Sequence, residues 1–188
     1  MGTVHHSIAS EGNPVKSVWA IIQHFDGWKS WKRFPDMDEL RAMTYAAIIH
    51  GANGITWYTY GGNGVNGRGV TSSREHWGEI CAIAGELSAN HDDLAGRDAK
   101  IQPTVKILSG PETDICGFGS ISVLMKEGGL VMAVNSSTNT VAVEMSIDGL
   151  RGVERRFNAG QVKLVAGKGF VDEFKPYGTH VYRVTMAQ

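Results

Sequence analysis

The spacing of apolar residues changes near residue 100 of this 188-residue chain. Before that point, apolar runs alternate with segments whose apolar residues recur every three or four positions, which predicts the order strand, helix, strand, helix. After it, only short segments of alternating character remain, separated by clusters of Gly, Pro, Ser, Asn and Asp. The sequence therefore predicts a two-part α+β chain, with parts that cover residues 1–97 and 98–188.

Two predicted strands lie in the first part. Residues 15–23 (VKSVWAIIQ) form a mostly apolar run, typical of a strand that is buried on both faces. Residues 54–60 (GITWYTY) are mostly β-branched and aromatic, which favours a second strand. Strands that alternate with helices are typically parallel, so we expect these two to be parallel.

Helix-capping patterns place the two predicted helices. Asp36 and Glu39 have the spacing of a capping box, and Gly51 stands where a C-terminal cap is expected. Ser72 and Glu75 form a second capping box before the second helix. The expected apolar face of that helix consists of Trp77, Ile80, Cys81, Ala84 and Leu87.

The second part predicts an antiparallel β-sandwich. Seven or eight short strands within about 85 residues, divided by turn residues, are typical of such a fold. The predicted strands cover residues 104–108, 120–125, 130–135, 141–147, 152–157, 161–165, 169–174 and 180–184.

Composition excludes several classes of function. The formal net charge is −1, so there is no electrostatic footprint for nucleic acid. No apolar run approaches the ~18 residues of a membrane span, and the N-terminus has no signal-peptide pattern, which leaves the localisation open. The glycine-rich segment 61–69 fits no phosphate-binding motif, and no cofactor is predicted. The two cysteines lack metal-ligand spacing, and His5 and His6 have no third ligand placed by spacing, so no metal site is predicted.

Several segments of the chain resemble a known architecture. PVKSVWAIIQHF, RFPDMDELRAMTYAAIIHGANGITWYTYGG and EHWGEICAIAGEL are similar to the closing segment of a glycoside-hydrolase-type (β/α)8 barrel. GGLVMAVNSSTNTVAVEMSIDGL and FKPYGTHVYRV resemble the β-sandwich that often follows such barrels. The resemblance implies that residues 1–97 are a partial barrel segment, its last two β/α units, and that residues 98–188 are the sandwich.

The same resemblance implies carbohydrate as the ligand class and glycosidic-bond hydrolysis as the activity of the related enzymes. Their acid/base Glu follows the fourth barrel strand, which this chain does not contain. Their usual nucleophile ends the seventh strand, where this chain has Gln23. Since glycoside hydrolysis generally needs a pair of carboxylates, we expect weak or absent hydrolysis, with Asp26 as the candidate catalytic residue and Asp36 or Asp38 as the alternatives.

Candidate sugar-binding residues follow from the position of the strand ends, which form the active face of a barrel. Aromatic rings stack on pyranose faces, and Gln and His side chains hydrogen-bond to hydroxyls. The alternative for Trp57 and Tyr58 is that they fill the barrel core. If the strand ends bind sugar, the candidate substrate-binding residues are Gln23, His24, Phe25, Trp28, Trp31, Tyr58 and Tyr60. His76 and Glu79, on the second helix, are interpreted as capping or surface residues.

Two alternatives stay open beside a glycoside-hydrolase-like protein. They are a non-catalytic carbohydrate-binding or accessory module carried by the sandwich, and a structural assembly unit. A two-stranded parallel sheet leaves both of its edges unpaired, and unpaired edges template pairing with another chain. The sequence thus predicts a homo-oligomer, either a dimer or a tetramer, unless residues 1–13 cover the edge.

Overall fold

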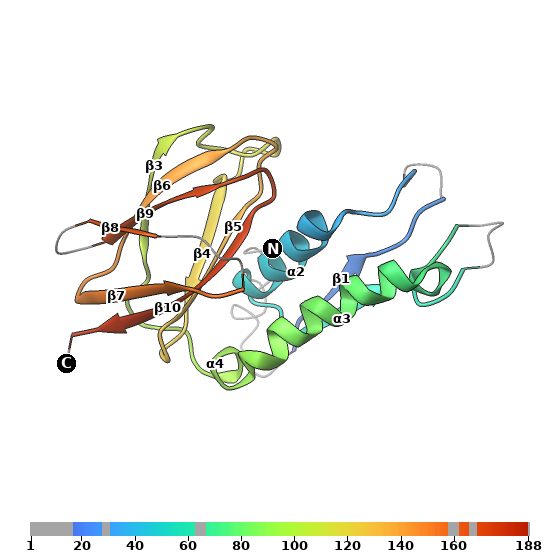
Figure 1. Ribbon diagram of the computed structural model, residues 1–188, viewed down its shortest axis with the longest axis horizontal. Helices are drawn as coiled ribbons and strands as arrows, with labels where there is room; N and C mark the ends of the chain where they lie inside the picture. Colours follow the sequence, from blue (N-terminus) through green and yellow to red (C-terminus); the bar gives the residue numbers. More distant parts are fainter. Residues whose placement is uncertain (1–16, 28–30, 63–66, 158–161, 166–168, 188) are drawn as a thin grey trace, which may run out of the picture. The chain divides into compact units, whose positions relative to one another are not determined.

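The computed structural model describes residues 17–27, 31–62, 67–157, 162–165 and 169–187 (Figure 1). The chain divides into two compact units, Met1–Gly85 and Glu86–Gln188. The described residues form a mixed α/β structure in which no sheet closes into a barrel. No helix among them is long and apolar enough to cross a membrane.

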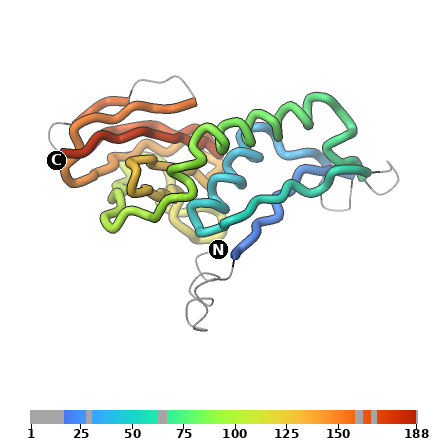
Figure 2. Tube along the Cα trace, turned by 90° about the horizontal axis from the view of Figure 1, so that it is seen from below, coloured from blue at the N-terminus to red at the C-terminus, as the bar shows by residue number. Residues whose placement is uncertain are grey.

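The first unit follows the predicted order of strand, helix, strand, helix (Figure 2). Its elements are β1 (Trp19–Gln23), α2 (Met37–Ile49), β2 (Gly54–Tyr58), the 3-10 turn η1 (Val70–Ser72) and α3 (Arg74–Ala89), which continues into the second unit. The strands β1 and β2 are parallel, with a register that runs from Trp19 opposite Gly54 to Gln23 opposite Tyr58. The predicted parallel pairing is therefore confirmed.

Caps at both ends of α2 define its length. The Asp36 side chain accepts from the Glu39 N–H, and the Glu39 side chain accepts from the Asp36 N–H, so the predicted capping box is confirmed. At the other end, Gly51 has a φ of 95°, and its N–H bonds to the Ile48 carbonyl. The Ala52 N–H bonds in turn to the Ala47 carbonyl, which completes a Schellman motif.

For α3 the predicted cap is wrong by one residue. The N–H of His76 bonds to the Ser73 side chain at 3.1 Å, so Ser73 caps the helix. Ser72 instead ends η1. Both serines carry a hydroxyl that could cap the helix. The 3-10 turn before α3 determines which hydroxyl lies next to the unpaired N–H groups of the first helical turn.

The two faces of β1 differ in burial. Ala20 and Ile22 are buried, whereas Trp19 and Ile21, on the other face of the strand, are 67% and 73% exposed. A β-carbon on Gly54 would lie 2.6 Å from the indole ring of Trp19. Trp19 therefore lies across Gly54 at the first paired position of the two strands.

The second unit begins with the last turn of α3 and the short helix α4 (His91–Ala95) and continues as two four-stranded antiparallel sheets. The strand order is β4-β5-β10-β7 in one sheet and β3-β6-β9-β8 in the other. The bounds are β3 (Thr104–Ser109), β4 (Ile121–Met125), β5 (Leu130–Asn135), β6 (Val141–Ser146), β7 (Leu150–Arg155), β8 (Lys163–Val165), β9 (Gly169–Phe174) and β10 (Thr179–Met186).

One hydrophobic core is shared by both sheets. It contains Val131 and Tyr182 from the first sheet with Val143, Phe170 and Phe174 from the second, all fully buried. Each of the eight predicted strands is present, with ends that shift by up to two residues. The predicted boundary after residue 97 lies within this unit, just after α4.

Candidate functional site

Polar and aromatic side chains gather where β1 and β2 end. The two strands keep hydrogen-bonding past their last paired residues: the His24 N–H donates to the Tyr58 carbonyl at 2.6 Å. Further on, Asp26 and Arg68 exchange backbone hydrogen bonds of 3.2 and 3.0 Å. The segment after β1 thus runs beside the segment after β2, and the start of α3 follows that second segment.

Aromatic side chains form one part of this site. The ring of Phe25 lies edge-on to Tyr58 at 5.6 Å and contacts Trp31 at 5.5 Å, and Phe25 itself is buried. Trp31, Tyr58 and Tyr60 are exposed. Tyr60 also lies edge-on to Trp77 of α3 at 6.4 Å. The strand ends therefore carry several accessible rings supported by a buried one.

The predicted sugar-binding residues differ in how far their side chains are exposed. Gln23 is half-buried, and its side-chain amide donates to the Phe25 carbonyl at 3.2 Å. His24 is fully buried, so it reaches a ligand only from inside the site. Trp28 lies outside the described residues. Sugar binding by the whole set stays a prediction.

Asp26, the candidate catalytic residue, is engaged by an arginine. Its side chain is 6% exposed, and both carboxylate oxygens accept hydrogen bonds from Arg68, one of them at 3.0 Å from the Nε atom. Hydrogen bonds from Arg68 hold the pKa of Asp26 below its ordinary 3.8, against the opposing effect of burial. Asp26 is therefore ionised at neutral pH and joins the two strand-end segments.

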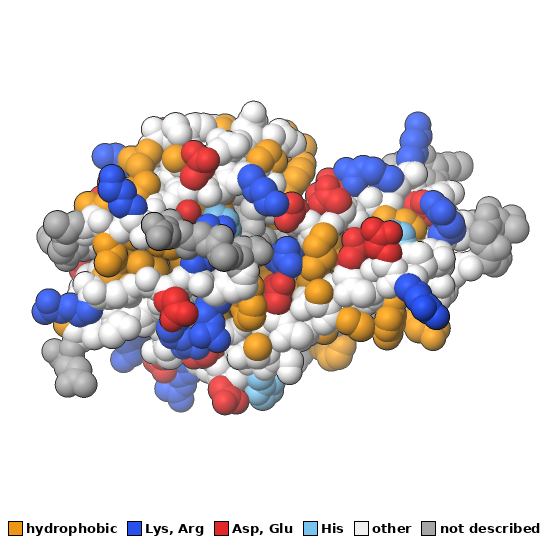
Figure 3. Space-filling model, viewed as in Figure 1, with side chains coloured by type: hydrophobic (Ala, Val, Ile, Leu, Met, Phe, Trp, Pro, Cys, Tyr) orange, Lys and Arg blue, Asp and Glu red, His pale blue; other side chains and the backbone are white. Residues whose placement is uncertain are grey.

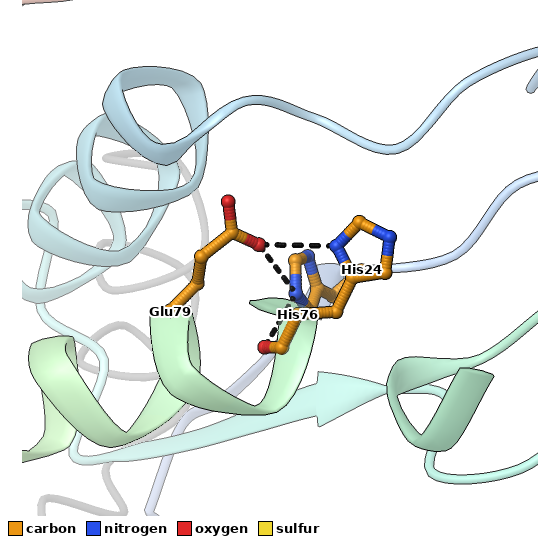
Figure 4. Close-up of side chains that lie close together, drawn as sticks. All are labelled: His24, His76 and Glu79. Carbon is orange, nitrogen blue, oxygen red and sulfur yellow. Dashed lines mark hydrogen bonds and ion pairs between the residues drawn. The ribbon is translucent and has the colours of Figure 1, made fainter. Parts of the chain in front are cut away.

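A second polar cluster lies beside it and consists of His24, His76 and Glu79 (Figure 4). One Glu79 oxygen lies 3.3 Å from His24 Nε2 and 3.2 Å from His76 Nδ1. His24 Nε2 is also 3.1 Å from the backbone carbonyl of His76. Burial lowers the pKa of His24 below its ordinary 6.5, although that carbonyl and Glu79 act in the opposite direction. Within the described part of the chain, these three side chains are the group of His, Cys, Asp and Glu residues whose donor atoms all lie within 4.8 Å of one another.

The interpretation of His76 and Glu79 as surface residues is wrong. Their side chains are 22% and 18% exposed, and both contact one another and a residue more than fifty positions earlier. Their i, i+3 spacing on a helix is the signal that sequence offers, because it places both on one face. Sequence spacing does not reveal that His24 faces them.

Comparison with models of known protein families and with curated proteins gives no match to this chain.

Proposed function

We propose that the strand-end surface of the first unit binds carbohydrate and that the chain is glycoside-hydrolase-like in ancestry. In this proposal β1, α2, β2 and α3 correspond to the last two units of a (β/α)8 barrel. The two sheets of the second unit correspond to the β-sandwich that follows such barrels. The parallel pairing of β1 with β2 and the shared core of the two antiparallel sheets support this assignment.

The observation that carries the proposal is a group of accessible aromatic rings at the carboxyl ends of parallel strands. Trp31, Tyr58 and Tyr60 are 44%, 43% and 71% exposed. Exposed rings of this kind stack on the apolar faces of sugars, and the neighbouring polar side chain of Gln23 offers directional hydrogen bonds. Strand ends are also where (β/α) folds place their ligands.

An accessory module carried by the second unit is favoured less. A sugar-binding sandwich would present a row of exposed aromatic rings along its strands. The exposed large aromatic side chains among the described residues of this unit are Phe118 and Phe157, and both lie outside the strands. The strand ends of the first unit therefore remain the favoured sugar surface.

Glycoside hydrolysis is expected to be weak or absent. It needs one carboxylic acid that donates a proton and a second carboxylate that acts as base or nucleophile. Asp26 is ion-paired with Arg68 and has a lowered pKa, which disfavours proton donation near neutral pH. Glu79 is engaged by His24 and His76.

The proposal is tested by carbohydrate binding to the whole chain. Native gels that contain individual soluble polysaccharides would identify a ligand, and calorimetry with its oligosaccharides would measure affinity. We expect Tyr60→Ala to weaken binding by about 2- to 10-fold, the value of one aromatic stacking contact. Phe118→Ala is the matched control, because Phe118 is 70% exposed but lies in the other unit.

Two results would overturn the proposal. One is binding that Tyr60→Ala and Trp31→Ala leave unchanged; the other is no binding to any polysaccharide or oligosaccharide tested. Turnover of aryl glycosides that Asp26→Asn abolishes would overturn the statement on hydrolysis alone.

A further inference from the structure

We propose that His24, His76 and Glu79 form a binding site for a divalent transition-metal ion of the zinc class. The proposal does not rest on carbohydrate binding: His24 is the one residue that it shares with the predicted sugar-binding set, and the exposed rings that carry the sugar proposal are not among the three ligands.

The separations between the donor atoms match a tetrahedral metal site. In zinc proteins the metal–nitrogen and metal–oxygen bonds are about 2.0–2.1 Å, which places neighbouring donor atoms about 3.3–3.4 Å apart. Glu79 Oε2 lies 3.3 Å from His24 Nε2 and 3.2 Å from His76 Nδ1. All three donor atoms lie within 4.8 Å of one another (Figure 4). An ion therefore fits among them with only small side-chain movements.

The rings are held in place before any ion binds. Phe34 stacks on His76 at 3.7 Å, with 15° between the ring planes, and lies edge-on to His24 at 5.3 Å. The ring of His24 is fully buried, and its Nδ1 has no hydrogen-bond partner among the described residues. Ligands whose orientation is fixed by packing lose little conformational entropy when they bind.

The donor set selects the class of ion. Two imidazoles with one carboxylate suit zinc and similar first-row ions, whereas calcium and magnesium prefer all-oxygen sites. Three protein ligands leave the fourth tetrahedral position for water or an exogenous oxygen ligand. On binding, His24 changes tautomer: Nε2 releases the proton that it donates to the His76 carbonyl and Nδ1 takes one up, so that the neutral ring coordinates through Nε2. The ion then connects the segment after β1 to the first turns of α3.

The competing explanation is a hydrogen-bonded cluster in which both histidines donate to Glu79 and no metal binds. Titration of the chelator-treated full chain with ZnCl2, followed by calorimetry, separates the two. We expect one ion per chain and a melting temperature that rises with Zn²⁺ concentration, because the ion binds the folded state. Co²⁺ in the same site should show the visible absorption bands of tetrahedral coordination.

Variants test the assignment of the ligands. His76 and Glu79 are half-buried, so they tolerate substitution better than the fully buried His24. His76→Ala and Glu79→Gln should each weaken Zn²⁺ binding by at least about tenfold. Glu75→Gln and His91→Ala are the matched controls: Glu75 is exposed on the same helix, and His91 has a 79% exposed side chain. Circular dichroism of the metal-free variants would show that they fold.

Because His5 and His6 are adjacent in the sequence, they are a second possible source of Zn²⁺ affinity. The double variant His5→Ala/His6→Ala should keep the one-to-one stoichiometry. The proposal is wrong if this variant loses Zn²⁺ binding, if His76→Ala and Glu79→Gln bind as tightly as the natural chain, or if millimolar Zn²⁺ produces neither heat nor a shift in melting temperature.

Discussion

Asp172 is the centre of a buried polar cluster that links the two sheets of the second unit. On β9, it accepts hydrogen bonds from Tyr182 at 2.6 Å and from His180 Nδ1 at 2.9 Å, both on β10. Arg155, on β7, contacts the other ring nitrogen of His180 and lies 3.7 Å from Asp172. A neutral imidazole satisfies both neighbours, since Nδ1–H donates to the carboxylate while Nε2 accepts from the guanidinium.

Burial affects the pKa values of Asp172, His180 and Tyr182. It lowers the pKa of His180 below its ordinary 6.5, although Asp172 acts in the opposite direction. Burial also acts to raise the pKa of Asp172. Hydrogen bonds from His180 and Tyr182 outweigh this effect, so the pKa of Asp172 lies below its ordinary 3.8. Burial also raises the pKa of the Tyr182 hydroxyl, which stays protonated.

These shifts predict how stability depends on pH. As the pH falls, His180 takes up a proton near pH 6.5 in the unfolded chain and only at lower pH in the folded chain. The stabilisation that comes from keeping His180 neutral is therefore complete above pH 6.5 and is lost as the pH falls below it. The contribution of Asp172 is lost only below about pH 3.8. Melting temperatures measured from about pH 7 down to pH 5 should fall less steeply in His180→Gln than in the natural chain. Equal slopes would contradict the prediction, and His91→Gln, with a 79% exposed side chain, is the control.

At the residue scale, sequence predicted contacts between near neighbours but not contacts between distant ones. The Asp36–Glu39 capping box depends on a three-residue spacing, so it is visible in the sequence and was confirmed. The contact between His24 and Glu79 depends on where a strand end lies relative to a helix, and no spacing encodes that. Arg68 was missed for the same reason, because it meets Asp26 across 42 positions.

At the scale of elements, α2 gives a direct test of local stability. Asp36→Ala removes the acceptor for the Glu39 N–H and should reduce the free energy of unfolding by about 1 kcal/mol. Asp38→Ala is the control, because Asp38 lies in the same first turn but does not cap the helix. Chemical denaturation measures the free energy of unfolding of both variants, compared where the dependence on denaturant concentration has the same slope. An Asp36→Ala variant as stable as Asp38→Ala would contradict the assigned role of the cap.

The strands of the second unit were easier to predict than the packing of α3. Turn residues divide the β-rich segment into short alternating runs, so the periodicity itself locates the strands. The predicted apolar face of α3 is wrong in part. The buried residue of this helix is Ile83, which the prediction did not include. Two residues that it did include are exposed, Trp77 (49%) and Cys81. Apolar residues surround much of this helix, and tertiary packing selects which of them is buried.

At the scale of the whole molecule, charge and exposed apolar surface govern association. The face in Figure 3 intermixes acidic and basic side chains, in keeping with a net charge of −1. In the described residues β1 and β2 pair only with each other, and Trp19 and Ile21 are exposed on β1. We propose that a second copy of the chain covers this surface, because unpaired edges and exposed apolar side chains favour association.

Sedimentation velocity tests this proposal. The natural chain should sediment as a dimer or a tetramer of the 20.3 kDa chain. Ile21→Lys should shift the population toward monomer, because it places a charge on the 73% exposed position of the strand. Ile115→Lys, at an 86% exposed position of the second unit, should leave the assembly unchanged. A natural chain that is monomeric at micromolar concentration would contradict the proposal.

The close approach of Trp19 to Gly54 has an evolutionary consequence. A β-carbon at position 54 would lie 2.6 Å from the indole, so a side chain there requires the Trp19 ring to move. Substitution at position 54 therefore depends on residue 19: a side chain at position 54 is accepted more easily where residue 19 is smaller or its ring turns away. Since these two residues are the first paired positions of β1 and β2, this constraint acts at the start of the parallel register.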